Sequence, residues 1–227
     1  NNPSQPMLLA ITPPNATPKV VQYYNALLGA GLSMLLLRLP DATQEQYEDC
    51  IRAIEPRHRS KVILADYFHL VPVAGLGGIH LKASRQKEWK HWQEVAQAQR
   101  ITASAHSLDE LESLPFCPDL ALLSPVFDSI SKGGYHANID LDECRSRLPK
   151  LPFPVLALGG ITPDNYPLVC SYGFAGGATL GYLAEQEDAM EEAFSRFARP
   201  EVLTIAGHDP SSGAGLTADV RTIERLG

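Results

Sequence analysis

The chain alternates short apolar runs with longer segments of mixed polarity from its beginning to about residue 198. Eight of the apolar runs are rich in Leu, Ile and Val, which is typical of strands that are buried on both faces of a sheet. The predicted strands are Met7–Thr12, Ser33–Arg38, Lys61–Asp66, Gly78–Lys82, Ile101–Ser104, Asp119–Ser124, Pro154–Leu158 and Ala175–Leu180.

A segment with helical periodicity follows each of these strands. The predicted helices are Pro18–Ala30, Thr43–Ile54, Tyr67–Ala74, Arg85–Ala98, Ser107–Leu114, Asp140–Leu148, Thr162–Ser171 and Gln186–Ala198. Three of the starts carry capping signals, namely Thr43 with Gln46, Ser107 with Glu110, and Thr162 with Pro163. Eight such units predict an α/β fold of the (β/α)₈ TIM barrel type, and an open doubly wound sheet remains the alternative.

The sequence after Ala198 departs from this pattern. A strand-like run, Val202–Ala206, leads into a Gly- and Ser-rich turn and then a helical segment, Leu216–Leu226. A lone strand and helix cannot bury both of their faces, so this unit is expected to belong to something larger. We therefore predict two domains, 1–198 and 199–227.

The charge and hydropathy of the chain exclude several classes of binding partner. The chain has 227 residues, with 19 basic and 26 acidic side chains and a formal net charge of −7. Basic residues are not clustered, which argues against nucleic acid or an anionic membrane as a partner. The apolar stretches, such as Met34 to Leu37, are far shorter than the roughly 20 residues that a membrane helix needs. We expect a cytoplasmic protein that binds a small molecule.

The four cysteines do not form a recognisable metal or redox motif. Their spacing matches neither zinc sites nor Cys-x-x-Cys motifs, so free thiols in a reducing compartment are expected. They are Cys50, Cys117, Cys144 and Cys170.

In a barrel, catalytic residues lie at the carboxyl ends of the strands. This rule selects Arg38, Asp66, Lys82, Ser104, His106, residues 124–136, the Gly159-Gly160 pair and Gly181. Arg38 is expected to face the barrel mouth, and the alternative is that it caps a surface loop. For His106 we expect an acid/base role, because imidazole titrates near neutral pH, and the alternative is a hydrogen bond in the helix cap.

Two features point to an anionic ligand. The loop from Pro125 to Asn138 contains Lys132 and His136 beside two glycines, which is typical of a lid or an anion clamp. The turns that contain Gly160 and Gly181 follow the seventh and eighth strands, where barrels often bind phosphate through backbone N–H groups.

Three stretches carry a family resemblance: residues 104–110 (SAHSLDE), 122–127 (LLSPVF) and 157–163 (ALGGITP). Over about residues 7–198 the chain resembles the thiamine phosphate synthase superfamily. Within it, the chain is more similar to the TenI-like branch, whose activity is thiazole tautomerisation. The resemblance implies a (β/α)₈ barrel that acts on a small phosphorylated thiazole.

Departures from the synthase pattern favour the TenI-like branch. Synthases carry Gln-x-Arg-x-Lys after the second strand, Asn-Asp after the third, and His-Leu-Gly-Gln with a nearby Asp after the fourth. The corresponding residues of this chain are Leu36, Arg38 and Pro40, then Ala65 and Asp66, then His80 to Ser84. Since Mg²⁺ at a diphosphate normally needs one or two carboxylates, the retention of Asp66 alone indicates a weakened metal site.

The resemblance implies roles for individual residues. His106 would be the catalytic acid/base, and Asp66 would hold a metal only in a synthase. The substrate-binding residues would be Arg38, Ser124, Lys132, Gly159, Gly160, Ile161, Leu180 and Gly181. We predict an isomerase, a thiazole tautomerase that needs no cofactor.

Two alternatives to the tautomerase stay open. The first is a transferase, a thiamine phosphate synthase that uses Asp66, Lys132 and Mg²⁺ to couple a pyrimidine diphosphate to thiazole phosphate. The second is a module that binds a thiazole or thiamine phosphate without catalysis. A homo-oligomer is compatible with each of them.

The tail has its own resemblance. Residues 203–215 (LTIAGHDPSSGAG), followed by Ala218-Asp219, are similar to the start of hydroxymethylpyrimidine (phosphate) kinases, which have a ribokinase-like fold. In that family the residue at the position of Asp209 helps to hold the pyrimidine. The resemblance implies a truncated kinase-like unit that lacks the phosphoryl-transfer residues.

Overall fold

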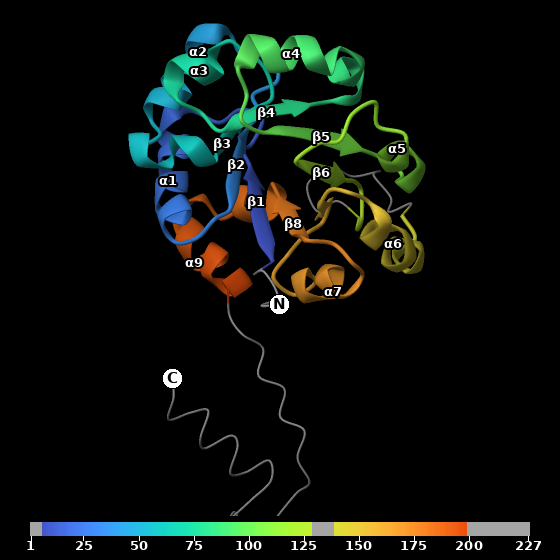
Figure 1. Ribbon diagram of the computed structural model, residues 1–227. Coiled ribbons are helices and arrows are strands. Elements are labelled where there is room, and N and C mark those ends of the chain that lie inside the picture. The colour runs from blue at the N-terminus through green and yellow to red at the C-terminus, as the bar shows by residue number, and fades with distance from the viewer. Residues whose placement is uncertain (1–5, 129–138, 199–227) are drawn as a thin grey trace, which may run out of the picture. The chain divides into compact units, whose positions relative to one another are not determined.

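The computed structural model describes residues 6–128 and 139–198, and its eight parallel strands form a closed barrel (Figure 1). The strands are β1 (Met7–Ile11), β2 (Met34–Leu37), β3 (Val62–Leu64), β4 (Gly78–Leu81), β5 (Ile101–Ala105), β6 (Leu120–Leu123), β7 (Val155–Leu158) and β8 (Gly176–Thr179). Strand β1 pairs with both β2 and β8, and the second pairing closes the barrel. The barrel prediction is confirmed, and the open sheet is excluded.

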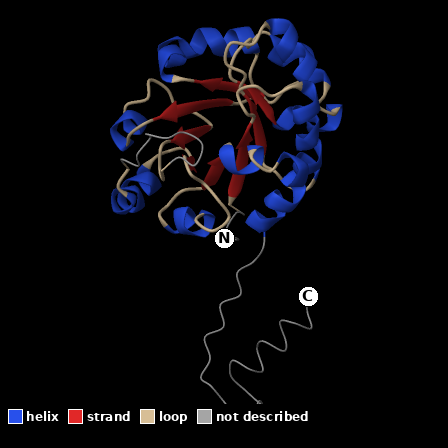
Figure 2. Ribbon diagram, turned by 180° about the vertical axis from the view of Figure 1, so that it is seen from behind, coloured by secondary structure: helices blue, strands red, loops and turns tan. Residues whose placement is uncertain are grey.

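Helices surround the barrel on its outer side, as the two opposite views in Figures 1 and 2 show. The α-helices are α1 (Pro18–Gly29), α2 (Gln44–Arg52), α3 (Leu70–Ala74), α4 (Trp89–Ala96), α5 (Leu108–Glu112), α6 (Leu141–Arg147), α7 (Tyr166–Ser171), α8 (Gly181–Ala184) and α9 (Met190–Ser195). Short 3₁₀ helices are η1 (Pro56–Lys61), η2 (Ala83–Glu88), η3 (Leu148–Lys150), η4 (Glu187–Ala189) and η5 (Arg196–Ala198). Within the described residues, no helix has the length and apolarity that crossing a membrane requires.

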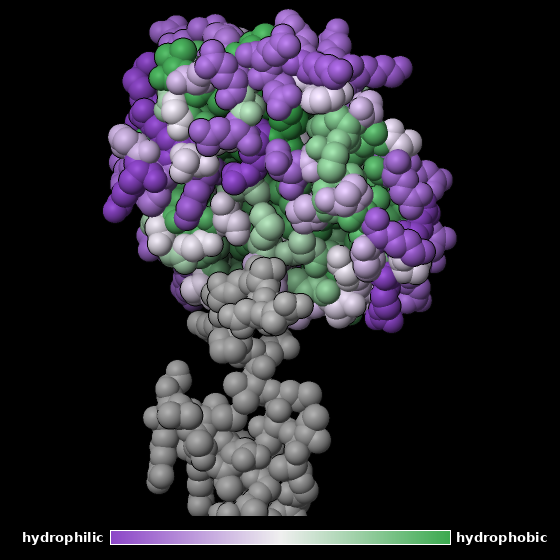
Figure 3. All heavy atoms as spheres, in the orientation of Figure 1, coloured by the Kyte–Doolittle hydropathy of each residue, from purple (hydrophilic) through white to green (hydrophobic). Residues whose placement is uncertain are grey.

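The strands bury side chains on both faces because the barrel interior and the helix layer are both apolar. In β1, Leu9 and Ile11 belong to the cluster inside the barrel, whereas Leu8 and Ala10 pack in the layer beneath the helices. Each fully buried Leu or Ile contributes about 1.5–3 kcal/mol relative to an exposed one. On the face in Figure 3, hydrophilic residues gather over outer helices such as α4, and apolar residues show mostly between them.

The capping predictions are confirmed in two of three places. Thr43 and Gln46 form a reciprocal capping box at the start of α2. The hydroxyl of Ser107 accepts a hydrogen bond from the backbone N–H of Glu110 at the start of α5. The helix start at Thr162 is wrong, because α7 begins only at Tyr166.

The predicted helix Gln186–Ala198 is confirmed as the continuous stretch of η4, α9 and η5, but the helix before it was missed. The chain already turns helical directly after β8, at α8, and then passes through η4 before α9 begins at Met190. A four-residue helix is too short to show a 3.6-residue period, which is why the hydrophobic pattern did not predict α8.

The four cysteines are unpaired thiols. Burial raises the pKa of the Cys50 and Cys144 thiols to about 11, so neither is a reactive thiolate at neutral pH. The second predicted domain, residues 199–227, lies outside the described residues together with Asp209, and the boundary at 198 stays a prediction.

Candidate functional site

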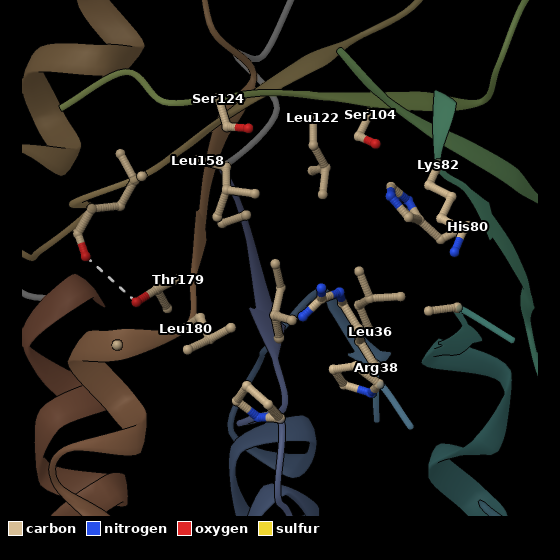
Figure 4. Close-up of a pocket in the computed structure, with 18 of the residues that line it drawn as sticks. Leu36, Arg38, His80, Lys82, Ser104, Leu122, Ser124, Leu158, Thr179 and Leu180 are labelled. Atoms are coloured by element: carbon tan, nitrogen blue, oxygen red, sulfur yellow. Dashed lines mark hydrogen bonds between the residues drawn. The ribbon is translucent and has the colours of Figure 1, made fainter. Parts of the chain in front are cut away.

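A cavity of about 580 Å³ opens at the carboxyl ends of the strands (Figure 4). A volume of this size suits a small-molecule ligand. The predicted residues that line it are Arg38, Asp66, Lys82, Ser104, His106, Ser124, Gly159, Gly160, Ile161, Leu180 and Gly181. Lys132 and His136 lie outside the described residues, so their roles stay predictions.

The turn after β7 requires glycine for two reasons. Gly159 and Gly160 have φ angles of +102° and +62°, which side chains rarely adopt. A Cβ atom at Gly160 would also lie 2.5 Å from the backbone oxygen of Asp128. The Asn165 side chain holds the turn, because its oxygen accepts from the N–H of Thr162 at 2.9 Å and its amide donates to the oxygen of Gly160 at 2.8 Å. These bonds explain why the helix does not begin at Thr162.

The turn after β8 lies beside it in the same cavity. The hydroxyl of Thr179 donates to the backbone oxygen of Ile161 at 3.4 Å, and so connects the two turns (Figure 4). Helix α8 begins directly at Gly181, and the first N–H groups of any helix lack an acceptor within the helix. The backbones of both turns line the cavity, and unpaired N–H groups at a turn or a helix start suit an anion such as phosphate.

His106 follows β5 and is held by a hydrogen bond to Ser124, the residue that follows β6. Its Nδ1 atom lies 3.1 Å from the backbone oxygen of Ser124 and 3.4 Å from the hydroxyl of Ser124. A carbonyl oxygen only accepts, so Nδ1 carries the proton and, in the neutral ring, Nε2 keeps its lone pair. The helix-cap alternative is wrong for this side chain, because only the backbone N–H of His106 bonds to Glu110 near the start of α5.

Arg38 points into the cavity from the end of β2 (Figure 4). Thr12 fixes its backbone from the neighbouring strand, since the Thr12 hydroxyl accepts from the Arg38 N–H at 3.0 Å and donates to the Arg38 oxygen at 3.2 Å. In the described part of the chain, the guanidinium forms no ion pair. Because Arg38 lines the cavity, it faces the barrel mouth as predicted and does not cap a surface loop, and its guanidinium is available to a ligand as far as the described residues show.

His80 was not predicted as a site residue, although it lines the cavity from β4. Its Nδ1 atom lies 2.8 Å from the hydroxyl of Thr102, and that hydroxyl donates to the backbone oxygen of Ile79 at 3.2 Å. His80 Nδ1 must therefore be the donor, which leaves Nε2 as an acceptor. Burial, and to a smaller extent the charge of Arg38, lower the pKa of His80 to about 4. His80 is thus a neutral polar group at neutral pH.

Asp66 is the one carboxylate retained from the synthase metal site, and other residues of this chain already bind it. Its Oδ1 atom accepts hydrogen bonds from Arg85 Nη2 and from the backbone N–H of Tyr67, each at 2.9 Å. The described residues contain no group of three or more His, Cys, Asp or Glu side chains that would hold a metal ion. One carboxylate beside a guanidinium is a poor Mg²⁺ ligand set, so these residues do not fit the metal.

The chain is similar to proteins named thiamine-phosphate synthase. One from Citrobacter koseri is 27% identical over 192 residues, which cover 82% of this chain and 88% of that protein. The thiamine biosynthesis bifunctional protein ThiED of Geobacter sulfurreducens is 36% identical over 139 residues, which cover 56% of this chain and 28% of that one.

The chain is also similar to solved structures of thiamine phosphate pyrophosphorylases. A thiamine phosphate pyrophosphorylase from Bacteroides thetaiotaomicron matches with a TM-score of 0.70 and 25% identity, over 85% of this chain and 95% of that chain. One from Pyrococcus furiosus matches with a TM-score of 0.66 and 22% identity, which supports the fold. The model of the TMP-TENI family, described as thiamine monophosphate synthase, matches residues 8–182. The chain is therefore a member of the TMP-TENI family and an enzyme of thiamine biosynthesis.

Proposed function

We propose that this enzyme is a thiazole tautomerase, which converts a thiazole phosphate carboxylate into its aromatic tautomer without a metal. One observation carries the proposal: the carboxylate expected at a metal site, Asp66, is paired with Arg85. A coupling reaction that expels pyrophosphate normally relies on a metal ion, whereas a proton shift needs only binding groups and one acid/base.

In this proposal the two sides of the cavity bind the two charged ends of the substrate. The backbone of Gly160, Ile161 and Gly181 would bind the phosphate, as donors at a turn and a helix start do in other barrels. Arg38 would bind the carboxylate, because a guanidinium presents paired N–H groups that match a carboxylate. Ser124, Gly159 and Leu180 would complete the wall around the ring.

His106 would then move the proton. With Nδ1 bonded to the oxygen of Ser124, its Nε2 lone pair takes a proton from the non-aromatic ring. The electron pair of that C–H bond moves into the ring, the double bond shifts, and the protonated His106 delivers a proton to the carbon at the other end. One C–H bond breaks and one forms, so the reaction is an isomerisation that needs no co-reactant.

The test is aromatisation by the purified protein in EDTA, followed by the ultraviolet absorbance of the aromatic thiazole. We expect turnover that EDTA does not change. Absence of aromatisation, with or without added Mg²⁺, would refute the tautomerase.

The second candidate is a thiamine phosphate synthase, and it is favoured by the names of the relatives. Its reaction couples a pyrimidine diphosphate to a thiazole phosphate, and formation of thiamine phosphate with and without EDTA tests it. Formation that needs Mg²⁺ would establish the synthase. Binding without turnover of either substrate set would instead indicate the non-catalytic module.

A further inference from the structure

Four charged side chains gather at the carboxyl ends of three neighbouring strands. Arg38 follows β2, Asp66 follows β3, and Lys82 and Arg85 follow β4. Arg38, Asp66 and Lys82 line the cavity, and Arg85 lies behind Asp66 as its ion-pair partner, with Nη2 and Oδ1 2.9 Å apart. Figure 4 shows Lys82 beside His80 at the cavity edge, and Arg38 directed toward the middle.

Arg85 is held firmly in this position. The short helix η2 turns the chain back on itself, with the Arg85 N–H donating to the oxygen of Lys82 at 2.9 Å. The guanidinium lies 5.0 Å from the ring centre of Phe68 and 5.1 Å from that of Trp92, within range of cation–π attraction. Its side chain is only 23% exposed. A cation packed in this way keeps its partner Asp66 in place.

The buried Gln86 anchors the same turn. Its amide nitrogen donates to the backbone oxygens of Leu81 at 3.1 Å and Ser104 at 2.8 Å. These bonds fix η2 to the ends of β4 and β5, so that Lys82 and Arg85 start from a rigid backbone. The backbone that carries Lys82 and Arg85 is therefore fixed at this wall of the cavity.

The net charge of this wall is positive. Arg85 neutralises the carboxylate of Asp66, and in the part of the chain that the structure describes neither Arg38 nor Lys82 has an ion-pair partner. We propose that Arg38 and Lys82 form a metal-free oxyanion subsite, and that Arg85 serves it by cancelling the charge of Asp66. The subsite takes the second anionic group of the ligand, opposite the glycine turns.

This inference deepens the proposed function, since a tautomerase substrate would place its carboxylate here. The chemistry is shared with the diphosphate of a synthase substrate, because both present oxygen atoms with delocalised negative charge. Equilibrium binding distinguishes a carboxylate from a diphosphate as the natural group, and it does not depend on turnover. A protein that fails to aromatise thiazole can still pass this test, and one that aromatises it can still fail.

The experiment is calorimetric binding of thiazole-2-carboxylate and of inorganic pyrophosphate, each in EDTA and again with Mg²⁺. We expect binding in EDTA that Mg²⁺ does not tighten. Lys82→Gln should weaken binding of the preferred probe about tenfold, as loss of a charge-assisted hydrogen bond does. The matched control is Lys87→Gln, which changes an exposed lysine of η2 outside the cavity and should bind like the wild type. Preference for thiazole-2-carboxylate would indicate the carboxylate as the natural group, and preference for pyrophosphate the diphosphate.

A double substitution tests the part assigned to Arg85. Arg85→Gln alone should weaken the preferred probe about fivefold or more, since the charge of Asp66 is then uncompensated. Adding Asp66→Asn in the same chain should restore binding. Failure of that rescue would overturn the assigned role of Arg85. Binding that needs Mg²⁺, or a Lys82→Gln protein that binds as tightly as the wild type, would overturn the subsite itself.

Discussion

The two sides of the cavity differ in the groups that line them: backbone groups on one side and charged side chains on the other. On the side of β7 and β8, the backbone of two glycine-containing turns faces the cavity, and the side chain of Asn165 only holds the turn. On the side of β2 to β4, the side chains of Arg38, Asp66 and Lys82 face it. Backbone donors tolerate most sequence changes as long as the glycines remain, whereas a side-chain wall changes its charge with a single substitution.

This difference explains how the family's common features and this chain's departures coexist. The glycine turns match the family pattern, and they belong to the side whose chemistry depends on backbone geometry. The departures at Leu36, Pro40 and Lys82 all fall on the side-chain wall. Substitutions on this wall would therefore change which second anionic group the cavity binds and whether it needs a metal.

The largest effect is expected at His106, which lies between the two sides. His106→Gln should lower the rate of aromatisation about 10²- to 10⁴-fold, because it removes the acid/base group. Binding of inorganic phosphate and of thiazole-2-carboxylate should change little. The control is Glu110→Gln, which keeps an acceptor for the backbone N–H of His106 and should retain most of the activity. A His106→Gln protein with wild-type turnover would contradict the mechanism.

Stability in acid probes the side-chain wall through His80. The folded protein binds a proton at His80 only near pH 4, whereas the unfolded chain binds it near 6.5. The unfolded state therefore gains protons first as the pH falls, and the free energy of unfolding should decrease by up to about 3 kcal/mol between pH 6.5 and 4.

Urea unfolding at several pH values measures this dependence. The slope of the free energy of unfolding against pH should become smaller in His80→Gln. It should stay as in the wild type in His91→Gln, which removes an exposed histidine of α4. An unchanged slope in His80→Gln would mean that another group accounts for the loss of stability in acid.

A smaller effect on stability is expected from Gly160→Ala, which distorts the glycine turn after β7. Ala at a positive φ costs about 1–2 kcal/mol, and its Cβ would in addition press against the oxygen of Asp128. The control is Gly75→Ala, since Gly75 has a similar φ of +68° with nothing within 4 Å of the added Cβ. Both variants should be less stable in thermal unfolding, but only Gly160→Ala should lose affinity for inorganic phosphate. Equal phosphate affinity of the two would argue against the glycine turn as the phosphate site.

The smallest effect is expected outside both sides, at Arg147. This residue pairs with Asp109 and Glu112 on α5 and with Glu143 on its own helix α6. The pairs lie at the surface, so Arg147→Gln should shift Tm less than Gly160→Ala does and leave ligand binding unchanged. A loss of ligand affinity would indicate that the α5–α6 packing controls the cavity.

The sequence was sufficient to predict the barrel and most of the cavity. Apolar strands at regular intervals specify a parallel barrel, and the carboxyl ends of parallel strands meet at one face, so residues such as Arg38, His106 and Gly181 were expected together. His80 was missed because it lies inside β4, where a polar residue gives no strand-end signal. The partnership of Asp66 with Arg85 was missed because only the fold of η2 brings these residues, 19 positions apart, into contact.

The hydrogen-bond chain from His80 through Thr102 to Ile79 gives the protein a reporter inside its own cavity. A buried Nδ1–H that is bonded to a buried hydroxyl exchanges slowly with water, so it should give a resolved proton resonance in nuclear magnetic resonance spectra. Because the pKa of His80 is about 4, the ring does not titrate near neutral pH. A shift of this Nδ1–H proton resonance at pH 7 would then report a ligand in contact with the ring, with no label attached to either molecule.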